Sequence, residues 1–140
     1  MIETGDIERA VADLLKSIGF SVVPVDAEDG FQKPACSIDV FPTGAEAQSW
    51  YMEEDSFAVD VAYYPRRETQ RELVRAAGAM KRIFLYTPLI IQSRSIDTDR
   101  VDFYREGMAL HMEVEYTVVQ NPHEEEEQPD GMEFLELEME

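Results

Sequence analysis

The strictest pattern in the chain is an alternation of apolar and polar or small residues between Met108 and Val118. The apolar members of the alternation are Met108, Leu110, Met112, Val114, Tyr116 and Val118. A strand places successive side chains on opposite faces, so this spacing predicts a strand with one buried face and one wet face. A sheet built around such a strand needs a second layer to cover its apolar side.

Two segments carry apolar residues at helical spacing and predict that second layer. The first helix is expected at about 4–18, followed by Gly19 in the position that ends a helix. The second is expected at about 69–85, where Thr69 and Glu72 match a capping box and Pro88 follows. The two apolar stripes consist of Ile7, Ala10, Val11, Leu14, Leu15 and Ile18, and of Leu73, Val74, Ala77, Met80, Ile83 and Phe84.

Shorter alternating segments predict the remaining strands. Their expected spans are 20–25, 36–40 (ended by Pro42), 89–96 and 101–105, with turns at 97–100 and 106–107. Pro24 assigns the first of them to an edge, because proline cannot donate to a ladder. Residues 48–64 are interpreted as one long strand, or as two strands joined by a bulge near residues 53–55.

The order of elements is helix, three strands, helix, three strands. Because short turns join antiparallel neighbours, we predict one α+β domain over residues 1–120, with a mostly antiparallel sheet and both helices on one face. Residues 121–140 then form an acidic C-terminal tail. The alternation over residues 135–140 allows this tail to end in a strand added to a sheet edge.

The net charge of the chain limits the functions that it can have. Thirty acidic residues against twelve basic ones give a net charge of −18, and half of that excess lies in residues 121–140. Such a surface argues against a general nucleic-acid binder. The chain has no apolar run near the roughly 20 residues of a membrane span. Its single cysteine, Cys36, excludes an internal disulfide, so we expect a soluble protein made in a reducing cytoplasm.

Motifs for catalysis, metal binding and cofactor binding are not found in the sequence. His111 and His123 have no second ligand at short spacing. The segment Asp97–Asp102 fails the calcium-loop pattern at its fifth, sixth and twelfth positions. Cys36 is expected to be a buried small apolar residue. We therefore predict a protein that is not an enzyme and that has no cofactor and no metal site.

One basic cluster stands out in this acidic chain: Arg66, Arg67, Arg71 and Arg75. Arg67, Arg71 and Arg75 recur every four residues, so they are expected to share one helix face. Two interpretations stay open. The arginines form a solvated face paired with Glu68 and Glu72, or they form a docking strip for an acidic partner such as a second copy of the chain.

Aromatic and apolar residues in polar surroundings give further candidate contacts. Trp50 and Tyr51 belong either to the core or to a strand end that projects and anchors an interface, and we favour the interface. Phe134 and Leu137 lie within the acidic tail, where a purely disordered segment would have few apolar residues. They are candidate contacts as well.

Three segments resemble successive elements of one bacteriophage family. In the first, Gly30-Phe31 precedes Pro34 and a strand; in the second, a strand ends in Tyr64-Pro65 before a helix. In the third, Glu106-Gly107 opens the alternating strand, at a place where the family usually has Asp-Gly. The family is the tail terminator-like proteins (minor tail, head–tail joining) of phages and prophages, and the likeness spans residues 3–119.

The resemblance implies a small α+β subunit that assembles into a ring, a hexamer. Such a ring binds the end of the tail tube protein, stops tube growth and offers a surface to the head–tail connector protein. It implies a place in the virion tail, assembly in the bacterial host cytoplasm, and no enzyme activity. An acidic lumen would let DNA pass without sticking. The alternatives are an acidic DNA mimic acting on a protein partner, and a small enzyme that uses paired carboxylates, which no motif supports.

Overall fold

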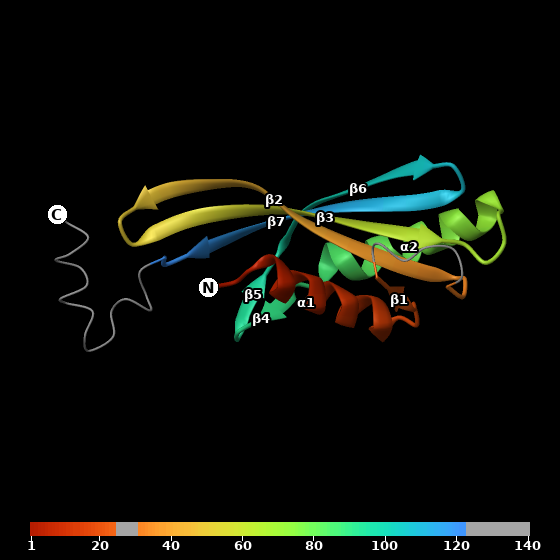
Figure 1. The fold of residues 1–140 in the computed structure, drawn as a ribbon, viewed down its shortest axis with the longest axis horizontal. Coiled ribbons are helices and arrows are strands. Elements are labelled where there is room, and N and C mark those ends of the chain that lie inside the picture. The colour runs from red at the N-terminus through yellow and green to blue at the C-terminus, as the bar shows by residue number, and fades with distance from the viewer. Residues whose placement is uncertain (25–30, 123–140) are drawn as a thin grey trace.

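The computed structural model describes residues 1–24 and 31–122, which form two helices and seven strands (Figure 1). In chain order the elements are α1 (Thr4–Ser17), β1 (Val22–Val23), β2 (Ala35–Ser49), β3 (Met52–Tyr64), α2 (Gln70–Tyr86), β4 (Leu89–Ile91), β5 (Arg94–Ile96), β6 (Thr98–Glu106) and β7 (Ala109–Gln120). Residues 25–30 and the tail beyond residue 122 lie outside the described residues.

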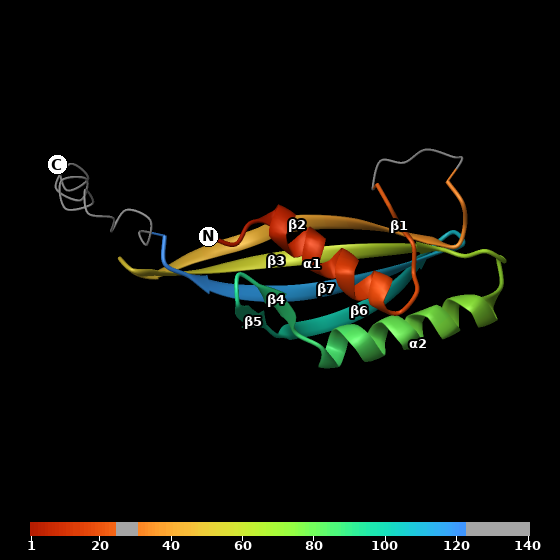
Figure 2. The same ribbon diagram turned by 90° about the horizontal axis from the view of Figure 1, so that it is seen from below.

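Five strands form one sheet in the order β1-β2-β3-β7-β6, and β4 pairs with β5 in a small separate hairpin. All pairs are antiparallel except the short β1–β2 contact. Figures 1 and 2 show both helices on the same side of the large sheet. The predicted α+β class is confirmed, and Pro24 follows an edge strand as expected.

The core lies between the helices and one face of the sheet. Every second residue of β7 from Leu110 to Gln120 is buried, which confirms the alternation that predicted this strand. The helices contribute most of their predicted apolar stripes, including Ile7, Val11 and Leu15 from α1 and Met80 and Phe84 from α2. The placement of Val74 in the buried stripe of α2 is wrong, because this residue is exposed. Burying these stripes stabilises the layers, since each fully buried large apolar side chain contributes about 1.5–3 kcal/mol.

The helix ends follow local signals in the sequence. After α1, Gly19 adopts φ +92°, and the N–H groups of Gly19 and Phe20 donate to the carbonyls of Lys16 and Leu15. This pair of bonds is a Schellman cap. At the start of α2, the Thr69 hydroxyl accepts from the Glu72 N–H at 3.2 Å. The other half of the predicted capping box, in which the Glu72 carboxylate would accept from the Thr69 N–H, is wrong, because that carboxylate accepts from other donors.

The predicted end of the second strand at Pro42 is wrong, because β2 continues to Ser49. Beyond Ser37, β2 pairs with β3 on one side and has an open outer edge, where proline is tolerated. A register shift between Pro42 and Gly44 absorbs the irregularity. Consequently residues 48–64 are neither one strand nor two strands joined by a bulge: they hold the end of β2, a turn at residues 50–51, and β3.

The prediction of a single strand over residues 89–96 is also wrong. This segment is the β4–β5 hairpin, whose turn residues Gln92 and Ser93 have φ values of 52° and 63°. Turns of this kind usually carry Asn or Gly, so Gln92 and Ser93 give no sequence signal for a turn. The predicted turn at residues 97–100 is wrong as well, because β6 already begins at Thr98 and passes a register shift before Arg100.

A buried amide joins the two ends of the described fold. Gln120 is 4% exposed; its side chain accepts from the Ile2 N–H at 2.6 Å and donates to the Ile2 carbonyl at 3.1 Å and to Asp55 at 2.6 Å.

Gln120→Ala would leave these groups unpaired, so we expect a loss of about 2 kcal/mol in the free energy of unfolding. Urea denaturation measures it. Gln92→Ala, at an exposed and weaker contact with Met1, should change it little; equal losses would contradict this role.

Candidate functional site

The sheet face turned away from the helices is acidic. Its strand positions alternate with the core residues, and we call it the open sheet face. The carboxylates on it include Asp39, Asp60, Asp99, Asp102, Glu106, Glu113 and Glu115, and the basic residues beside them include Arg100 and His111. This face therefore concentrates negative charge on one side of the described fold.

Four of these carboxylates stand in a row across four strands. Asp39 lies opposite Asp60, Asp60 lies opposite Glu113, and Glu113 lies opposite Asp102. Residues in such positions have Cβ atoms about 4.5–5.5 Å apart, and like charges there destabilise a sheet. Arg100 offsets one end of the row: its hydrogen bond to Asp102, 2.7 Å long, lowers the pKa of that carboxyl.

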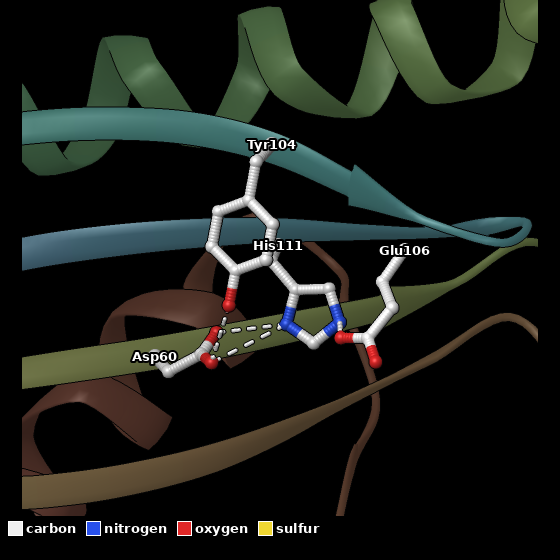
Figure 3. Close-up of polar contacts among 4 residues, drawn as sticks. All are labelled: Asp60, Tyr104, Glu106 and His111. Carbon is white, nitrogen blue, oxygen red and sulfur yellow. Dashed lines mark hydrogen bonds and ion pairs between the residues drawn. The ribbon is translucent and has the colours of Figure 1, made fainter.

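A histidine and a tyrosine contact Asp60, one of the inner carboxylates of the row (Figure 3). His111 Nδ1 lies 3.0 Å from Asp60 Oδ1, and the Tyr104 hydroxyl donates to Asp60 Oδ2 at 3.1 Å. The Tyr104 ring stacks on the imidazole with centroids 4.8 Å apart, and Glu106 lies 3.5 Å from Nε2. Desolvation raises the pKa of Tyr104, and the bond to Asp60 adds to that. These contacts fix the position of the Asp60 carboxylate on the sheet.

The cluster is not arranged as a metal site or as a tyrosine activated by a histidine. The Tyr104 hydroxyl is directed at Asp60 and not at an imidazole nitrogen, so His111 is not placed to activate it. Across residues 1–24 and 31–122, no three His, Cys, Asp or Glu side chains are grouped to hold a metal ion. Cys36 is buried as predicted, and desolvation raises the pKa of its thiol to about 12.

Glu113 gives a direct test of the cost of the acidic row. Glu113→Lys would place a cation opposite both Asp60 and Asp102, so we expect the free energy of unfolding to rise by about 0.5–1 kcal/mol at low salt. Glu115 is a matched control, because it lies opposite Ala58 and Arg100. Glu115→Lys should not stabilise the fold. Urea denaturation at two salt concentrations measures both variants, and no gain for Glu113→Lys would refute the repulsion.

The arginine cluster surrounds a surface hollow of about 290 Å³, lined by Arg66, Arg67, Thr69, Arg71, Glu72 and Arg75. Helix α2 begins at Gln70, so the expectation that Arg67 shares a helix face with Arg71 and Arg75 is wrong. The hollow nevertheless brings these arginines together. Among the described residues, none of the four arginine side chains lies in an ion pair. The choice between a solvated face and a docking strip stays a prediction.

Glu72 organises the backbone beside this hollow. Its carboxylate accepts from the N–H groups of Arg66 and Arg67 at 2.6 and 2.9 Å, and from the Tyr63 hydroxyl at 2.9 Å. Desolvation alone would raise the pKa of Glu72, but these hydrogen bonds and the Arg67 charge together lower it. The carboxylate is therefore occupied by the loop that leads into α2.

The lowered pKa of Glu72 predicts a pH dependence. A carboxyl whose folded pKa is depressed stabilises the fold above its unfolded pKa of about 4.3, and this contribution disappears as pH falls through the folded pKa. Glu72→Gln should therefore be less stable than the natural chain at pH 7, and the gap should close toward pH 3. Thermal unfolding from pH 3 to 7 measures this gap. Glu68→Gln is the control, and a gap independent of pH would contradict the prediction.

The tip of the β2–β3 hairpin is exposed and apolar. Trp50, Tyr51 and Met52 are 46%, 55% and 47% exposed, and Figure 1 shows the hairpin extending well past the helices. The core interpretation of Trp50 and Tyr51 is wrong, because they form the turn. Their role as interface anchors stays a prediction. Phe134 and Leu137, the other candidate contacts, lie outside the described residues.

Comparison with known proteins identifies a family. A family model described as phage tail terminator protein matches residues 6–128, which confirms the resemblance found in the sequence. No curated protein matches the chain. One solved structure aligns over 84% of this chain and 91% of its own, with 11% identity and a TM-score of 0.47. Neither of the two described helices is long and apolar enough to cross a membrane.

Proposed function

Since the chain belongs to the phage tail terminator family, with a structural role in the phage tail, we propose that it forms a ring at the end of the tail tube. The ring stops polymerisation of the tube protein and joins the tail to the head–tail connector protein. The family match over residues 6–128 carries this proposal. The protein acts through contacts with itself and these partners, in the virion tail and in the host cytoplasm during assembly, and not as an enzyme.

The two candidate contact regions lie at opposite ends of the subunit. The hairpin tip is at one end of the long axis, and the start of α2, which carries the arginine hollow, is at the other (Figure 1). Head-to-tail contacts between different surfaces build rings when the rotation closes. A hexameric ring that uses Trp50 and Tyr51 on one surface and Arg67, Arg71 and Arg75 on another fits this arrangement.

The open sheet face supports a role in DNA passage. A row of four carboxylates destabilises the sheet, so its presence favours a function that needs the charge. We infer that this face lines the lumen of the ring, where it repels the phosphates of DNA that moves through the tail.

The same charge favours one alternative, a DNA mimic whose carboxylates occupy the phosphate-binding site of another protein. The arginine hollow disfavours it, because clustered arginines do not resemble phosphate. The two functions differ in assembly state and in competition with DNA. A monomer or dimer that displaces DNA from a protein target would support the mimic.

Assembly with the tube protein tests the proposed function. The chain alone at high concentration, and the chain with tail tube subunits, would be compared by light scattering and negative-stain electron microscopy. We expect rings that cap tube ends, and tubes that stop growing when the chain is added. A strict monomer under all these conditions, together with unchanged tube growth, would overturn the proposal.

A further inference from the structure

The solvent side of α2 is cationic and apolar along its whole length. Of its exposed residues, one stripe along the helix consists of Arg71, Val74, Arg75, Gly78, Arg82 and Leu85. The helix contains one acidic residue, Glu72, whose carboxylate is bonded to the preceding loop. Val74 is 60% exposed in the midst of these arginines. We call this surface the cationic helix face.

The cationic helix face has no covering layer in the described fold. Figure 2 shows α2 at the margin of the molecule, with one side turned away from the sheet and from α1. Within residues 1–24 and 31–122, no carboxylate forms an ion pair with Arg71, Arg75 or Arg82. In a chain of net charge −18, such a face is suited to bind an acidic polypeptide segment.

The chain itself contains a segment of the matching chemistry. Residues 133–140 read Glu-Phe-Leu-Glu-Leu-Glu-Met-Glu, with four glutamates, four apolar residues and no cation. We propose that residues 133–140 bind along the cationic helix face, in an extended conformation, with their glutamates held by Arg71, Arg75 and Arg82.

The repeat distances of the two surfaces match. Arg71 and Arg75 are four residues apart on a helix that rises 1.5 Å per residue, so they are separated by about 6 Å along its axis. Glu136 and Glu138 are two residues apart, which in an extended chain is about 6.6–6.8 Å. Arg71 and Arg75 can therefore meet two glutamates that are two residues apart on the segment.

The overall lengths match as well. The 17 residues of α2 span about 25 Å, and the eight residues of the segment, fully extended, span about 26 Å. In an extended chain, alternation puts Leu135, Leu137 and Met139 on the side of the segment opposite Glu136, Glu138 and Glu140. That side can lie on Val74 and over Gly78, where a missing side chain leaves room, while the long arginine side chains reach the carboxylates.

This contact deepens the proposed role of the arginines, because it names the acidic surface that they meet. It can form within one chain or between two copies. Its formation therefore does not depend on a ring, and a failed ring experiment would leave it testable. A second copy's open sheet face is the competing acidic surface, and the experiment separates the two.

Photo-crosslinking from the segment tests the contact in the full chain. Met139→Cys supplies a thiol for a benzophenone label, while Cys36 is buried and its raised thiol pKa leaves it unreactive. After irradiation, mass spectrometry maps the attached peptides. We expect crosslinks concentrated on residues 71–86 at about 0.05 M salt, with a yield at least five-fold lower at about 0.5 M, where exposed charge pairs are screened.

Charge-swap variants sharpen the test. Arg71→Glu with Arg75→Glu should remove the crosslinks to α2, and adding Glu136→Lys and Glu138→Lys should restore them. Arg9→Glu with Lys16→Glu, on exposed positions of α1, is the matched control and should leave them unchanged. Crosslinks that fall on the open sheet face, that are absent from α2, or that survive the arginine reversal without loss would overturn the proposal.

Discussion

Reversing Arg67, Arg71 and Arg75 to glutamate is expected to abolish assembly of the chain while leaving its fold intact. The three side chains line an exposed hollow, and exposed charges contribute on the order of 0–1 kcal/mol each to stability. Like charges across an interface cost several kcal/mol, so the same change opposes any contact with an acidic surface. Circular dichroism measures the fold, and sedimentation measures the oligomer and its binding to tube ends.

Salt provides the internal control for this charge reversal. Assembly of the natural chain should weaken between about 0.05 and 0.5 M salt, because exposed pairs are screened. The triple variant should show little further loss over that range. If it assembles normally at low salt, the arginine hollow has no part in contacts between subunits.

Phe84→Ala is expected to destabilise the fold by about 3–5 kcal/mol, the usual cost of deleting a buried phenylalanine. Phe84 is 0% exposed and lies in the core beside the sheet. The loss is large against a typical domain stability of about 5–15 kcal/mol. Urea denaturation measures it, with Leu85→Ala at the exposed neighbouring position as the control. A loss below about 1 kcal/mol would show that the two layers pack loosely there.

Sequence periodicity correctly predicted the elements that bury one of their faces in the core. Both helices and the alternation of β7 follow from one buried face, which a sequence records directly. The prediction failed for one segment without a buried face. From Phe41 to Ser49, β2 is exposed along its whole length, and its strand conformation depends on pairing with β3. Nothing local in that sequence distinguishes it from a loop.

The surfaces were predicted in part. The arginines were visible as a cluster of one residue type, although the helix boundary separates Arg67 from the others. The row of four carboxylates could not be foreseen, because Asp39, Asp60, Asp102 and Glu113 come from four strands whose register was unknown. The same holds for the stacking of Tyr104 on His111. A sequence shows composition on one strand, while pairing decides what lies beside it.

The position of β7 has a consequence for how the chain folds during synthesis. This strand is the last in the described chain, yet it lies between β3 and β6 in the sheet. Until it leaves the ribosome, the earlier strands expose two unpaired edges and a core without its central apolar row. The nascent chain therefore cannot complete its sheet stepwise from the N-terminus, and it should be a client for chaperones until β7 has emerged.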